Sequence, residues 1–127
     1  MNLDARRYAR QVRLVDVGEG GQARIAAAEG VVTGGGLSAL VEARYLAGAG
    51  FGRIVAADEE VARVATETNP SVVVAVDAAG GAAREPLRPA GQGSVEASLE
   101  SLSPACRDVA LGAYRALAAL RAVVLLP

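Results

Sequence analysis

Several residue types that carry common enzyme chemistry are missing from this chain of 127 residues. It contains no histidine and no lysine, so all 13 of its cationic residues are arginine. These absences exclude a histidine base, a histidine metal ligand, a lysine Schiff base and a lysine that neutralises a transferring phosphate. The chain also has a single cysteine, which excludes a disulfide within the chain and a cysteine-rich zinc site.

Aromatic residues and net charge are scarce as well, at 3% and −1. A nucleic-acid surface concentrates basic side chains and stacks bases on aromatic rings, so we expect no nucleic-acid partner. No apolar run approaches the roughly 18 residues that span a bilayer. The N-terminus lacks the apolar run of a signal peptide. We therefore expect no membrane association and a cytoplasmic location.

The length indicates one domain, which can bury roughly two-thirds of its unfolded surface. Mean hydropathy is +0.30, and much of the apolar content is alanine. The patterns divide the chain into N-terminal helices (1–28), a βαβ unit with a glycine turn (29–60), a helix and a strand (61–77), a loop-rich segment (78–102) and a C-terminal helix (103–127).

The βαβ unit is the clearest pattern in the sequence. An apolar run at 29–33 stops at three consecutive glycines, and apolar residues then recur at helical spacing over 37–49. Gly50 marks the end of this helix. A second apolar run at 53–57 is followed by Asp58. The unit reads as strand, glycine turn, helix, strand and acidic residue.

Such a unit is typical of nucleotide-binding proteins. The turn Gly34-Gly35-Gly36 leads into a helix N-terminus, where free backbone N–H groups and the helix dipole favour a phosphate. Asp58 lies 22 residues after Gly36, the spacing at which an acid can bind a ribose hydroxyl. Only Gly35 matches a dinucleotide fingerprint, because Thr33 and Ser38 occupy the outer glycine positions. A βαβ unit whose glycine turn binds no ligand is the alternative.

The rest of the chain carries further element patterns. Asp4 can cap a first helix over 5–14, and residues 18–21 are expected to break the chain before a second helix at 22–28. The later elements are expected to be a helix at 61–68, a strand at 71–76, a loop at 78–94, a short helix or edge strand at 94–102, a helix from Ser103-Pro104 to 120, and a continuation of that helix or a final strand at 121–126.

Four segments within the first 60 residues occur in a specific order: Arg7-Tyr8-Ala9-Arg10-Gln11-Val12-Arg13-Leu14, Gly18-Glu19-Gly20-Gly21-Gln22, Val31-Val32-Thr33-Gly34-Gly35-Gly36-Leu37, and Leu46-Ala47-Gly48-Ala49-Gly50-Phe51-Gly52-Arg53-Ile54, followed by Asp58. Together they resemble the ThiF/MoeB/HesA family, the prokaryotic relatives of ubiquitin-activating enzymes. The resemblance implies a Rossmann-like domain that binds ATP and magnesium. It also implies adenylylation of the C-terminus of a ubiquitin-like or sulfur-carrier protein, and a dimer.

The resemblance assigns roles to a few residues. Gly35 and Gly36 match the glycines that face the ATP phosphates. Asp58 matches the acid that binds the ribose, and Glu60 matches a second acid nearby. Arg10 resembles an arginine that reaches the nucleotide of the partner in such dimers.

Other positions of the family pattern are missing here. The chain has no Asn-x-x-Arg segment and no phosphate-binding lysine, although Arg63 or Arg84 could substitute for the lysine. The register of the strand at 71–77 is ambiguous, because it resembles both the third and the fourth strand of the family. Asp77 is the nearest candidate for the magnesium-binding aspartate, and a turn residue is the alternative interpretation.

Cys106 is a second candidate for chemistry. In the first turn of the C-terminal helix, beside Arg107, a thiol has its pKa lowered by the helix dipole and the guanidinium, which favours a nucleophile. A small buried thiol is the alternative, and the one that this residue type favours.

We therefore expect an α/β fold of the Rossmann-like type, with a small, mostly parallel sheet of about three to five strands in the order 3-2-1 and helices on both faces. The function expected from these patterns is a degenerate, non-catalytic nucleotide-binding-fold module that acts through a homodimer or a partner protein. The alternatives are an ATP-dependent adenylyltransferase and a protein that binds NAD or a similar dinucleotide. The dimer is expected to use the free edge of the first strand, the C-terminal segment and the N-terminal helix.

Overall fold

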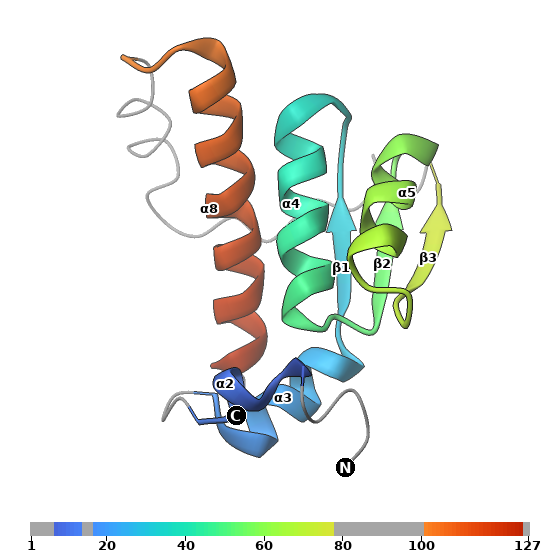
Figure 1. Ribbon diagram of the computed structural model, residues 1–127, viewed down its shortest axis with the longest axis vertical. Helices are drawn as coiled ribbons and strands as arrows, with labels where there is room; N and C mark the ends of the chain where they lie inside the picture. Colours follow the sequence, from blue (N-terminus) through green and yellow to red (C-terminus); the bar gives the residue numbers. More distant parts are fainter. Residues whose placement is uncertain (1–6, 14–16, 78–100, 126–127) are drawn as a thin grey trace.

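The computed structural model describes residues 7–13, 17–77 and 101–125 (Figure 1). Its elements in chain order are α2 (Ala9–Val12), α3 (Gly18–Ala27), β1 (Glu29–Val32), α4 (Gly36–Ala49), β2 (Arg53–Ala56), α5 (Glu59–Thr68), β3 (Val73–Val76) and α8 (Pro104–Val124). None of the helices in these segments combines the length and the apolar character needed to cross a bilayer.

The three strands form one parallel sheet in the order β1-β2-β3. Gly30 pairs with Ile54, and Ile54 pairs with Val74. The α/β class and the 3-2-1 order predicted from the sequence are confirmed. β3 pairs in parallel with β2 at one edge of the sheet.

The two crossover helices lie on the same face of the sheet. α4 contacts β1 and β2, α5 contacts β2 and β3, and the two helices pack against each other. Because both connections run in the same direction across the sheet, right-handed crossovers bring their helices to one side. The sequence predicted helices on both faces, but these two share one. The opposite face carries an ion pair of 3.1 Å between Arg53 Nε and Glu29 Oε2 and a Val73 that is 57% exposed.

The core lies between this face of the sheet and its helices. Its largest fully buried side chains are Phe51, Ile25, Leu46, Ile54, Val32 and Val61. Gly30 allows the close approach of α4 to β1, because a Cβ at this position would lie 2.9 Å from Leu46 Cδ1. Gly50 ends α4 in the left-handed conformation, with φ +106°, and its N–H donates to the carbonyls of Leu46 and Ala47. The predicted helix end is therefore confirmed.

Helix α8 lies alongside α4 (Figure 1) and continues through Val124, so residues 121–124 extend the helix and form no final strand. Ser103 caps it by accepting a hydrogen bond from Cys106 N, and Pro104 occupies the first turn, as predicted. A Cβ at Gly112 would overlap the Ser38 carbonyl oxygen and lie 2.9 Å from Val41 Cβ. Glycine thus allows the two helix backbones to approach closely.

The prediction of a chain break at residues 18–21 is wrong, because α3 begins at Gly18. The N–H of Gly21 donates to the Val17 carbonyl at 2.8 Å, and Gly21 is a buried residue of α3. Tertiary packing here overrides the low helix propensity of glycine. The predictions for Asp4, for the loop at 78–94 and for most of the element at 94–102 lie outside the described residues.

Candidate functional site

The glycine turn lies at the carboxyl edge of the sheet, directly after β1. Gly34 and Gly36 have φ angles of +76° and +79°, which a side chain at either position would strain. Gly35 is the N-cap of α4, and all three glycines are exposed. The first turn of α4 contains no acidic residue. The backbone N–H groups at this helix start are therefore accessible to an anion.

Asp58 lies against this turn. Its Oδ1 accepts a hydrogen bond of 2.9 Å from Val61 N, which makes it the N-cap of α5. Its Oδ2 lies so close to Gly35 that a Cβ added there would be 2.7 Å away. The structure therefore brings together Gly35 and Asp58, two of the residues that the sequence predicted to face a nucleotide. One carboxylate oxygen holds the helix, and the other lies at the glycine turn.

The remaining acidic candidates lie on α5 and directly after β3. Glu60 is exposed in the first turn of α5, and Asp77 is exposed at the end of β3, where its N–H donates to the Ala56 carbonyl at 2.8 Å. Within the described residues, no group of three His, Cys, Asp or Glu side chains could hold a metal ion.

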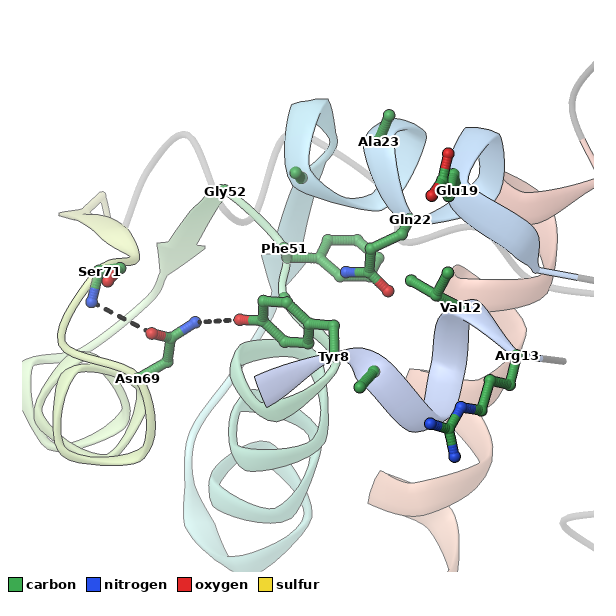
Figure 2. Close-up of a pocket in the computed structure, with 13 residues that line it drawn as sticks. Tyr8, Val12, Arg13, Glu19, Gln22, Ala23, Phe51, Gly52, Asn69 and Ser71 are labelled. Atoms are coloured by element: carbon green, nitrogen blue, oxygen red, sulfur yellow. Dashed lines mark hydrogen bonds between the residues drawn. The ribbon is translucent and has the colours of Figure 1, made fainter. Parts of the chain in front are cut away.

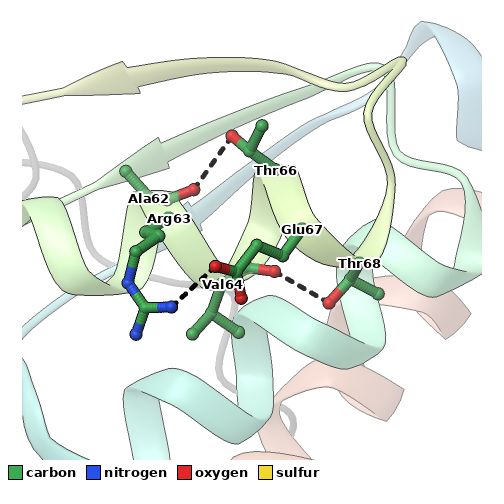
Figure 3. Close-up of polar contacts among 6 residues, drawn as sticks. All are labelled: Ala62, Arg63, Val64, Thr66, Glu67 and Thr68. Atoms are coloured by element: carbon green, nitrogen blue, oxygen red, sulfur yellow. Dashed lines mark hydrogen bonds and ion pairs between the residues drawn. The ribbon is translucent and has the colours of Figure 1, made fainter.

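The arginines considered as substitutes for a catalytic lysine have other positions. Arg63 is exposed on α5 and forms an ion pair of 2.7 Å with Glu67 (Figure 3). On the same helix Thr68 Oγ1 donates to the Val64 carbonyl. Arg84 lies outside the described residues. Arg10 is exposed on α2, which packs at the opposite end of α4 from the glycine turn.

Cys106 is exposed in the first turn of α8. The expectation of a buried thiol is therefore wrong. The reason is that α8 buries Gly112, Ala116 and Val124, and this face does not include its first turn.

A cavity that the sequence did not predict lies at the amino-terminal edge of the sheet (Figure 2). Its volume is about 680 Å³, and α2, α3 and the turns before β2 and β3 form its walls. Tyr8, Val12, Phe51 and Asn69 are among the lining residues. Volumes of roughly 300–1,000 Å³ are typical of small-molecule sites.

Two polar networks hold α2 over this edge. Asn69 is 3% exposed and donates through Nδ2 to Tyr8 Oη at 2.9 Å and to the Ala47 carbonyl at 3.1 Å. Its Oδ1 accepts from Arg7 at 2.6 Å and from Ser71 N at 3.1 Å. In the second network, Gln11 Nε2 donates to Gln22 Oε1 at 2.9 Å and to the Ala49 carbonyl at 3.0 Å.

These networks give a structural role to much of the N-terminal motif. The side chains of Arg7, Tyr8 and Gln11 all take part in them and so fix α2 over this edge of the sheet. The sequence patterns assigned no role to Asn69. An asparagine beside a strand start is a local signal of a turn, and nothing local identifies its partner 61 residues away.

Among the residues that the structure describes, Glu42 is the other buried polar residue, at 3% exposure on α4. Burial raises the pKa of its carboxyl group from 4.5 to about 7, and the charge of Arg115 on α8 opposes this increase.

Comparisons of the chain with models of known protein families and with curated proteins found no match. The resemblance to the ThiF/MoeB/HesA family therefore stays a hypothesis based on the quoted residues.

Proposed function

We propose that this chain is a non-catalytic nucleotide-binding-fold module that binds the phosphate and ribose of an adenine nucleotide at the glycine turn. The observation that carries the proposal is the contact between Asp58 Oδ2 and Gly35 at the start of α4. Ligands of open parallel α/β sheets bind outside the carboxyl ends of the strands, which is the position of this contact. The exposed helix start is suited to the phosphate, and the second carboxylate oxygen is suited to a ribose hydroxyl.

The non-catalytic part of the proposal rests on the groups that adenylyl transfer needs. This reaction depends on positioning and on charge stabilisation at the phosphates. The chain has no lysine or histidine, and Arg63 is paired with Glu67. Arg10 lies at the far end of α4, a helix of 14 residues, so about 21 Å separates the two ends. The adenylyltransferase remains the alternative function.

Calorimetric titration with ATP, ADP and NAD tests the nucleotide site. Asp58→Asn keeps an oxygen that can cap α5 and removes the negative charge. We expect this variant to unfold at the wild-type temperature and to bind ATP about 10-fold more weakly, because one hydrogen bond to a charged group is lost. Asp58→Ala should also lose about 1 kcal/mol of stability with the cap. Glu59→Gln, which changes the same charge one residue later, is the matched control.

Absence of ATP and ADP binding at millimolar concentration would refute the nucleotide site, as would equal affinity of wild type and Asp58→Asn. Tighter binding of NAD than of ATP would favour the dinucleotide alternative. ATP–pyrophosphate exchange in the presence of candidate carrier proteins addresses catalysis separately. Turnover in that assay would favour the adenylyltransferase.

The module is further proposed to work as a homodimer. In the three-stranded sheet, β1 and β3 are the outer strands, and an uncovered strand edge tends to pair with another chain. Sedimentation equilibrium should give a mass of twice 12.8 kDa. A strictly monomeric mass at micromolar concentration would contradict this part of the proposal and would leave the nucleotide site untouched.

A further inference from the structure

The cavity at the amino-terminal edge of the sheet collects a large share of the aromatic side chains. The chain has one phenylalanine and three tyrosines, and Phe51 and Tyr8 both line this cavity. Val12 points toward them from α2 in Figure 2, and alanines of α2 and α3 line the remaining wall. Phe51 is 1% exposed, so the half-buried Tyr8 supplies the accessible aromatic surface of these walls. Because aromatic pairs contribute stabilisation beyond the burial of area, this surface favours a flat aromatic occupant.

Within the described part of the chain, Tyr8 and Gln22 each keep one donor hydrogen at the cavity without an acceptor. The oxygen and the nitrogen of the Asn69 side-chain amide form hydrogen bonds with four partners in total, and Gln22 Oε1 accepts from Gln11. The Tyr8 hydroxyl accepts from Asn69, and in the described part of the chain no acceptor takes its own hydrogen. Gln22 Nε2 donates one of its two hydrogens, to the Ala49 carbonyl at 3.3 Å.

Charges at the cavity are balanced. Arg13 and Glu19, one residue of each sign, are the charged residues among those recorded along its walls. These two charges therefore favour a ligand of neither sign. Binding of an uncharged ligand also avoids the cost of removing a charged group from water.

We propose that this cavity is a second binding site, for a small uncharged aromatic molecule that presents a carbonyl-type acceptor to the Tyr8 hydroxyl. Asn69 positions that hydroxyl, because its Nδ2 donates to Tyr8 Oη and its other contacts fix the amide between β3 and α4. The site is independent of the glycine turn, which lies at the other end of α4. Success or failure at either site therefore says nothing about the other.

Two matched probes test the proposal with the whole wild-type chain. Acetophenone and ethylbenzene have nearly the same shape, and only acetophenone has an acceptor. In ¹H–¹⁵N shift titrations we expect both probes to perturb the amides of Tyr8, Phe51 and Gly52, with acetophenone bound about five-fold more tightly, as one neutral hydrogen bond predicts.

Two variants separate the hydrogen bond from the cavity itself. Tyr8→Phe keeps the ring and should reduce the affinity for acetophenone to that for ethylbenzene. Val12→Phe adds bulk to the wall next to Tyr8 and should weaken the binding of both probes. Val109→Phe is the matched control, because Val109 is 44% exposed on α8 and does not line the cavity.

Three results would overturn the site. They are no shifts with either probe at millimolar concentration, equal affinity of the wild type for the two probes, and unchanged binding by Val12→Phe. The first two need no variant, so a folding defect in Tyr8→Phe or Val12→Phe cannot hide the answer.

Discussion

Glu42 makes the stability of this fold depend on pH in a direction opposite to that of a salt-bridged carboxylate. The group is 3% exposed on α4, and burial raises its pKa to about 7, while Arg115 lowers it. In the unfolded chain the pKa returns to 4.5. Between these values the folded state binds more protons than the unfolded state, so stability falls as pH rises.

The size of the effect follows from the two pKa values. The stabilisation is complete below pH 4.5 and is lost progressively up to about pH 7, above which it stays constant. The difference between the two plateaus is about 3 kcal/mol. This is a large share of the roughly 5–15 kcal/mol that stabilises a typical domain.

The perturbation that isolates this group is Glu42→Gln, which has nearly the same shape and no charge to desolvate. Urea unfolding followed by circular dichroism at pH 5, 6, 7 and 8 gives the free energy of unfolding for wild type and variant. We expect the variant to gain on the wild type as pH rises, by up to about 3 kcal/mol at pH 8. Arg115→Gln in the wild-type background should enlarge the pH dependence, since it removes the opposing charge.

Subtracting the two pH profiles cancels every other titrating group. A difference between wild type and Glu42→Gln that stays constant from pH 5 to pH 8 would refute the reasoning. It would mean that the carboxyl group is solvated in the folded state, and hence that α4 and α8 are packed less closely at this position than the structure has them.

Two further substitutions test packing and buried polarity. Gly112→Ala should destabilise the fold by about 1–3 kcal/mol in urea unfolding, despite the better helix propensity of alanine, because the new Cβ meets the Ser38 carbonyl oxygen. The control Gly48→Ala should be neutral or stabilising, because its Cβ would find its nearest neighbour at 3.9 Å. Equal effects of the two substitutions would contradict the close contact between α4 and α8. Asn69→Ala should lower the free energy of unfolding by about 2–4 kcal/mol, since it leaves the Ala47 carbonyl and Ser71 N without their amide partners. Glu59→Ala, at an exposed position, should lower it by under about 1 kcal/mol. A similar loss of stability in both variants would argue against the network.

The elements that depend on neighbouring residues could be predicted from the sequence. The strands, their order and the end of α4 at Gly50 follow from valine-rich runs, short crossovers and a glycine that adopts positive φ. Asp58 was predicted as a site residue, but its second role as the cap of α5 became evident only in the structure. A capping aspartate and a ribose-binding aspartate occupy the same position after a strand, and the sequence does not distinguish them.

Features that depend on distant contacts could not be predicted. Gly112 resembles a weak point in a helix until Ser38 is known to lie against it. The helical start at Gly18 and the exposure of Cys106 depend in the same way on what packs beside them. The cavity needs the turns before β2 and β3 to meet α2, and no local pattern specifies that meeting.

Arg10 is the residue that best tests what the N-terminal motif is for. Arg7, Tyr8 and Gln11 each have a structural role in fixing α2, so their presence does not require a nucleotide. Arg10 is exposed and lies far from the glycine turn of its own chain. If it reaches the nucleotide of a second copy, Arg10→Ala should weaken ATP binding only at protein concentrations where the dimer forms, with unfolding unchanged. Equal ATP affinity of wild type and Arg10→Ala in the dimer would mean that the N-terminal motif has only a structural role. The resemblance to the ThiF/MoeB/HesA family would then rest on the glycine turn and Asp58 alone.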